Sequence, residues 1–138
     1  MQKGIKILSE IVGLGDEIQR HQFYRMSIRI WLHKGDPIKW TKPFGLLDRK
    51  EISEDLQTLT ADYRVDREFL FSGLFYGVQG MRIGGTRLLE ISPHLAYREH
   101  GVPDMIPPNA LLKVEVSIHG ERLMTNENTV EQGAAANP

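Results

Sequence analysis

The stretch of sequence that decides the fold is GVQGMRIGGTRLLEISPHLAYREHGVPDMIPPNALL, residues 77–112. Within it, residues 86–91 lie between a glycine pair and Pro93, and this punctuation is typical of a strand that ends at turns. Residues 97–108 are rich in Gly and Pro and predict a loop. Residues 111–118 then place an apolar side chain at every second position, which predicts a strand with one buried face.

Further strand patterns precede this stretch. Residues 24–30 alternate apolar and polar side chains, as a half-buried strand does. A turn over residues 33–37 follows, and Ile38 is expected to begin the returning strand. The apolar residues in 5–8 predict a first strand, and the apolar run 69–76 predicts a short helix packed against the sheet.

Residues 41–62 fit neither periodicity over their whole length. Pro43 and Gly45 favour a loop, and the segment from Asp48 onwards is strongly charged. We therefore expect a surface excursion here, with one short element around Ile52 to Leu59. Because strand patterns outnumber the single helical one, the predicted fold class is α+β, an antiparallel sheet with one short helix.

The length and composition predict one ordinary globular domain. The chain has 138 residues, of which 41% are hydrophobic, enough for one core. We place the domain at residues 1–120. Residues 121–138 are mostly small and polar, so they are expected to form a disordered tail.

Charge and cysteine usage exclude several classes of function. The formal net charge of -1 gives no electrostatic footprint for nucleic acid or an acidic membrane. The chain has no cysteine, which excludes disulfides, a thiol nucleophile and a Cys-ligated zinc site. Its five histidines are scattered, so no metal and no cofactor are expected. With no apolar run long enough for a signal peptide or a membrane span, we expect a cytoplasmic monomer.

The decisive stretch resembles the FKBP-type peptidyl-prolyl isomerase family. It carries ISPHLAY at 91–97 and IPPNALL at 106–112, at nearly the spacing of the family's strand end and of its double-proline turn. The resemblance extends more loosely over residues 5–118, with 41–62 as an insertion. It implies that the sheet is a half barrel wrapped around the helix, and that the partners are proline-containing peptide or protein segments.

The resemblance also implies roles for individual residues. Catalytic roles fall on Tyr97, Phe71 and Ile106. Contacts to the substrate fall on Ile28, Ile38, Lys39, Leu70, Phe71, Leu74, Tyr97, Met105, Ile106 and Val114. Five positions depart from the family pattern. Ile28, Ile38 and Lys39 stand at the family's tyrosine, phenylalanine and aspartate. Leu74 stands at the tryptophan that floors the proline pocket, and Val114 at a phenylalanine of the last strand.

Two functions are open on these residues. The first is a peptidyl-prolyl cis-trans isomerase that acts on X-Pro bonds with reduced activity. The second is a non-catalytic FKBP-fold module that binds protein segments or acts as a chaperone. The changes at Lys39 and Leu74 favour the second function, whereas the retained Tyr97 and Ile106 favour the first. A third idea makes residues 41–62 a docking surface for a partner.

Overall fold

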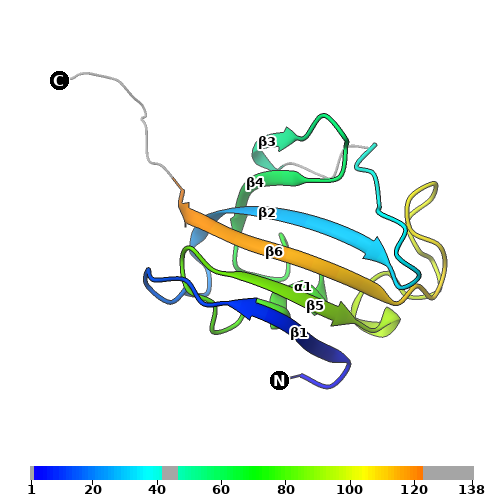
Figure 1. The fold of residues 1–138 in the computed structure, drawn as a ribbon, viewed down its shortest axis with the longest axis horizontal. Coiled ribbons are helices and arrows are strands. Elements are labelled where there is room, and N and C mark those ends of the chain that lie inside the picture. The colour runs from blue at the N-terminus through cyan, green and yellow to red at the C-terminus, as the bar shows by residue number, and fades with distance from the viewer. Residues whose placement is uncertain (1, 42–46, 123–138) are drawn as a thin grey trace.

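Six antiparallel strands, drawn in Figure 1, form one open sheet in the computed structural model, which describes residues 2–41 and 47–122. The strands are β1 (Ile5–Ile11), β2 (Phe23–Leu32), β3 (Asp48–Ile52), β4 (Leu59–Arg64), β5 (Thr86–Ile91) and β6 (Leu112–Glu121). Helix α1 (Ser72–Gly77) and the 3-10 helix η1 (Pro93–Leu95) complete the set. The spatial order is β1-β5-β6-β2-β4-β3, so the predicted α+β class with an antiparallel sheet and one short α-helix is confirmed.

The alternating segments form the centre of the sheet. In the pairing of β2 with β6, Ile28 lies opposite Val116 and Ile30 opposite Val114, and all four side chains are buried. Because side chains alternate between the two faces of a strand, the apolar half of each strand packs in the core. The polar half lies on the outer face.

Helix α1 packs closely on the inner face of the sheet, behind β5 in Figure 1. A Cβ atom on Gly73 would lie 2.3 Å from Ile91 Cγ2, and one on Gly77 would lie 2.5 Å from Leu89 Cδ1. Only residues without a side chain allow this approach. The two glycines therefore let the short helix approach the sheet closely enough to place its own apolar side chains in the core.

The expectation for residues 41–62 was wrong in two respects. The segment 53–58 is not an element but the turn between β3 and β4. Strand β4 is also not a surface excursion, because Leu59 and Ala61 are buried where β4 pairs with β2. The strand expected from Ile38 does not form either, since this residue only donates its N–H to Ile30 O over 2.8 Å.

A buried carboxylate ties β4 to its neighbours on the outer face. The Asp62 side chain is 1% exposed. Its oxygens accept hydrogen bonds from Arg49 Nε at 2.8 Å and from Arg25 Nη1 at 3.2 Å. Burial alone would raise the pKa of Asp62, but the hydrogen bonds from Arg49 and Arg25 lower it below its usual value. Asp62 therefore stays charged near neutral pH and links β2, β3 and β4.

The end of β6 lies slightly beyond the expected boundary at residue 120. The strand runs to Glu121, which pairs with Tyr24. Arg122 places its guanidinium 4.1 Å from the centroid of the Phe23 ring. The rest of the predicted tail, from residue 123 onwards, lies outside the described residues. Within the described ranges, no helix combines the length and the apolar character needed to cross a membrane.

Candidate functional site

A small apolar pocket of about 110 Å³ opens between the inner face of the sheet and helix α1. It is lined by Ile28, Trp40, Leu47, Leu59, Tyr63, Phe69, Phe71, Leu74 and Tyr97. None of these lining residues is charged. An apolar enclosure with a few polar groups at defined places is the usual form of a small-ligand site.

Two strands and the helix build the walls. Ile28 on β2 lies opposite Leu59 on β4, and Tyr63 follows on the same face of β4 four residues later. Phe71 is the N-cap residue of α1, and Leu74 is buried within the helix. The pocket therefore lies between residues that are distant in sequence but fixed by regular structure.

Trp40 enters the pocket from the segment after β2. Its backbone N–H donates to Leu56 O at 2.7 Å, and its indole Nε1 donates to Gln57 O at 3.0 Å. Both bonds hold the indole against the turn between β3 and β4. The ring is 6% exposed and shares the pocket with Leu74, so an aromatic side chain is present although the family's tryptophan position is a leucine.

Phe71 and Tyr97 form an aromatic pair in the pocket wall. Their ring centroids are 5.2 Å apart with the planes tilted by 43°, within the range of favourable ring contacts. Burial raises the pKa of Tyr97 to about 12. Its hydroxyl is therefore protonated at neutral pH and can donate a hydrogen bond.

The structure brings together four of the residues that the resemblance assigned to substrate. Ile28, Phe71, Leu74 and Tyr97 all line the pocket. The others lie elsewhere. Ile38, Leu70 and Val114 are buried in the core without lining it, and Lys39 is exposed on the surface.

Met105 and Ile106 line another hollow, of about 330 Å³, together with residues of the 100–108 loop. Ile106 is 5% exposed there and pairs with Val102. The backbone at Gly101 makes this pairing possible. Its φ is +59°, and a Cβ atom would lie 2.2 Å from Ile106 O.

Five lining residues were not predicted from the sequence. They are Trp40, Leu47, Leu59, Tyr63 and Phe69. A signal for two of them was present, because apolar or aromatic residues recur at 59, 61, 63 and 65 with the period of a half-buried strand. No local signal indicated Trp40 or Leu47, since their place depends on how the chain folds back along β4.

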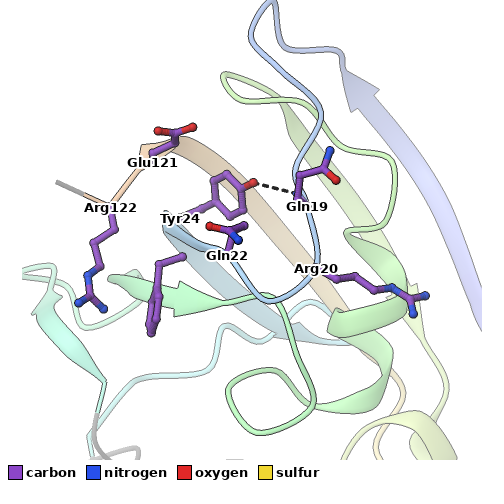
Figure 2. Close-up of a pocket in the computed structure, with 7 residues that line it drawn as sticks. Gln19, Arg20, Gln22, Tyr24, Glu121 and Arg122 are labelled. Carbon is purple, nitrogen blue, oxygen red and sulfur yellow. Dashed lines mark hydrogen bonds between the residues drawn. The ribbon is translucent and has the colours of Figure 1, made fainter. Parts of the chain in front are cut away.

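A larger hollow, of about 840 Å³, lies near the start of β2 and the end of β6 (Figure 2). Its lining is mainly polar or charged and includes Gln19, Arg20 and Glu121. None of the residues assigned to substrate lines it. Over residues 2–41 and 47–122, no three His, Asp or Glu side chains gather as a metal site requires.

Comparison with known proteins assigns the chain to a family. Residues 34–119 match the family model of FKBP-type peptidyl-prolyl cis-trans isomerases. The chain belongs to the FKBP family. Among its relatives, the 39 kDa FK506-binding nuclear protein of Drosophila melanogaster is 30% identical over 115 residues, which is 83% of this chain and 29% of that protein. A chloroplastic peptidyl-prolyl cis-trans isomerase of Arabidopsis thaliana is 43% identical over 53 residues, 38% of this chain and 23% of that protein.

Solved structures of FKBP proteins share the fold. A peptidyl-prolyl isomerase of Pseudomonas syringae superposes with a TM-score of 0.61 at 18% identity, covering 86% of this chain and 81% of that one. FkpA of Escherichia coli superposes with a TM-score of 0.60 at 23% identity, covering 86% of this chain and 51% of that one. At these identities the likeness concerns the fold. The chain spans less than a third of the length of the two sequence relatives above.

Proposed function

We propose that this FKBP-family chain catalyses the cis/trans isomerisation of X-Pro bonds in peptide or protein segments. The observation that carries the proposal is the pocket without charged lining residues, in which the family-assigned residues Ile28, Phe71, Leu74 and Tyr97 come together. A proline ring is compact and apolar, and such a pocket can take it out of water.

The chemistry needs no nucleophile or acid. The X-Pro bond prefers trans by only ~0.5–1 kcal/mol, but the barrier to rotation is about 18–20 kcal/mol because the planar imide has partial double-bond character. Twisting the bond breaks this resonance and leaves a less polar group. A pocket that binds the twisted form more tightly than either planar form lowers the barrier.

The pocket residues supply apolar surface and hydrogen-bond donors. Leu74 and Trp40 offer apolar surface for the proline ring. Tyr97 supplies a protonated hydroxyl, and the backbone N–H of Phe71 has no acceptor among the described residues. Both can hold a peptide carbonyl in place while the bond rotates.

A non-catalytic binding module is the second candidate. It is favoured by one observation, namely that Lys39 is exposed and lies outside the pocket lining. No carboxylate therefore stands where the family has an aspartate. Such a pocket would bind proline segments without favouring the twisted form.

Exchange NMR on a short X-Pro peptide separates the two candidates, because it reports binding and cis/trans exchange together. We expect the protein to bind the peptide and to accelerate exchange. Phe71→Ala should reduce the acceleration about two- to tenfold, since a ring contact contributes roughly 0.5–1.5 kcal/mol beyond burial. Binding without any acceleration would instead favour the binding module.

Tyr76→Ala is the matched control. Tyr76 is also an aromatic, partly buried residue at α1, and its ring packs against Phe75 with centroids 5.2 Å apart. It does not line the pocket. The variant should lose some stability and keep the exchange rate of the unmodified protein. An equal loss of exchange in both variants would assign the effect to the helix rather than to the pocket.

A further inference from the structure

Two phenol side chains line the apolar pocket, Tyr63 from β4 and Tyr97 from the loop after η1. Tyr97 occupies a position to which the family resemblance gives a role, whereas Tyr63 does not. The Tyr63 side chain is 4% exposed. Neither hydroxyl has a hydrogen-bond partner among the described residues.

A buried hydroxyl without a partner is unusual, since most buried polar groups are hydrogen-bonded. Leaving one unsatisfied costs free energy comparable to that of a lost hydrogen bond. Within the described part of the chain, Arg29 Nε is the one fully enclosed polar side-chain atom without a partner. The Tyr63 oxygen is therefore not fully enclosed, and Tyr63 lines the pocket.

Tyr24, on the neighbouring strand, has a buried hydroxyl that is hydrogen-bonded. It lies directly opposite Tyr63 in the pairing of β2 with β4, and it is equally buried, at 4% exposed. Its hydroxyl accepts a hydrogen bond from the backbone N–H of Gln19 at 2.8 Å, as Figure 2 shows. The two tyrosines are paired and equally buried, but only Tyr63, in the apolar pocket, lacks a hydrogen-bond partner among the described residues.

The hydroxyl of Tyr63 is a donor under ordinary conditions. Burial, and then the neighbouring phenol of Tyr97, raise the pKa of Tyr63 above its usual value. The group is therefore protonated at neutral pH. Together with Tyr97 and the backbone N–H of Phe71, it gives the pocket a set of donors and no charged acceptor. A peptide carbonyl oxygen is the ligand group that matches this set.

We propose that Tyr63 is a substrate-contacting residue whose hydroxyl donates a hydrogen bond to a carbonyl oxygen of the bound X-Pro segment. This inference rests on the proposed function, because it places the segment in the same pocket. It adds a donor from β4 opposite the wall formed by the helix. Position 28, on the neighbouring strand, is an isoleucine and cannot supply such a bond.

The test compares Tyr63→Phe with Tyr24→Phe in the full chain. Each variant removes one hydroxyl from a buried ring. The probe is a blocked tetrapeptide with leucine before proline, and Kd, the cis/trans exchange rate and Tm are measured on the same samples. Tyr63→Phe should weaken binding about three- to tenfold with Tm unchanged or raised. Tyr24→Phe should lower Tm by about 3–6 °C and leave Kd unchanged.

The outcomes separate this inference from the proposed function. Unchanged Kd and exchange rate in Tyr63→Phe would overturn the inference and leave the isomerase proposal standing. A lower Tm in Tyr63→Phe would also overturn it, since it would reveal a structural partner for the hydroxyl. Weaker binding by this variant, with no accelerated exchange by the unmodified protein, would support the inference and reject the isomerase. Absence of any peptide binding would reject both.

Discussion

Buried polar groups on the two faces of the sheet differ in their hydrogen bonding. On the outer face Asp62 is paired with Arg25 and Arg49, although Arg29 Nε has no partner among the described residues. In the pocket on the inner face, the hydroxyls of Tyr63 and Tyr97 have no partner among the described residues.

This difference predicts which residues contribute to stability and which contribute to ligand binding. A polar group with a good partner contributes to folding, and its loss costs free energy. A buried polar group without a partner lowers stability, and where it lines a pocket it can bind a ligand. Outer-face variants should therefore change stability without changing peptide binding, and pocket variants should do the reverse.

The largest expected effect on the outer face is that of Asp62→Asn. The variant leaves Arg25, whose side chain is 16% exposed, without its buried charge partner. Breaking a buried ion pair costs about 3–5 kcal/mol. Because Arg49 is 47% exposed and keeps its hydration, we expect a smaller loss of about 2–3 kcal/mol. Urea unfolding measures this loss in free energy of unfolding. The affinity for the peptide, measured below Tm, should not change.

Asp55→Asn is the control for this prediction. Asp55 is exposed and accepts a hydrogen bond from Ser53 Oγ at 2.6 Å in the turn between β3 and β4. Asp55→Asn should lower the free energy of unfolding much less than Asp62→Asn does. Equal losses in the two variants would show that burial of the Asp62 carboxylate contributes little.

The pH dependence of stability follows from the same carboxylate. The pKa of Asp62 is lowered in the folded state, so its contribution is fully present above the unfolded value of about 4. It is lost as the pH falls through the lower folded pKa, because the unfolded chain then binds more protons. The stability difference between the unmodified protein and Asp62→Asn should therefore shrink below about pH 4. A constant difference down to pH 2.5 would contradict this assignment.

A smaller effect is expected at Ser27, also on the outer face. Its hydroxyl lies 2.7 Å from Thr60 Oγ1 and 2.6 Å from His119 Nε2. Ser27→Ala should cost about 0.5–1.5 kcal/mol, the usual net contribution of a hydrogen bond. Thermal unfolding measures the loss. Weaker peptide binding in this variant would mean that the two faces are coupled.

The smallest effect is expected at Lys39, which occupies the position of the family's aspartate. Its side chain is exposed and lies outside the pocket lining. Lys39→Ala should change unfolding free energy by less than about 0.5 kcal/mol and should leave peptide affinity as it was. A clear change in affinity would show that the lysine reaches the bound segment.

The central strands were predictable because each carries its own signal. The alternation in 24–30 and 111–118 and the punctuation around 86–91 lie within single segments. The structure places all three in the sheet. Strand β3 carries no such signal, since all its residues are exposed. In β4 the sequence alternates, but Asp62 on the polar side is buried, and its burial depends on arginines from β2 and β3.

The site was predictable in part for the same reason. Phe71, Leu74 and Tyr97 lie in or near the stretch that resembles the family, and all three line the pocket. Trp40 reaches it through contacts between distant segments, which the sequence pattern does not encode locally, whereas Tyr63 follows the alternation in 59–65. A role for Tyr63 follows only from the structure, in which its buried hydroxyl has no hydrogen-bond partner among the described residues.

The measurement that tests the central claim most directly is the set of intermolecular NOEs from a peptide with an isotope-labelled proline. We expect NOEs from the proline ring to the side chains of Leu74, Trp40 and Tyr63. Phe23 and Tyr24, at the hollow in Figure 2, should show none. The reverse pattern would contradict this placement, because the proline would then bind near the start of β2 instead of in the apolar pocket.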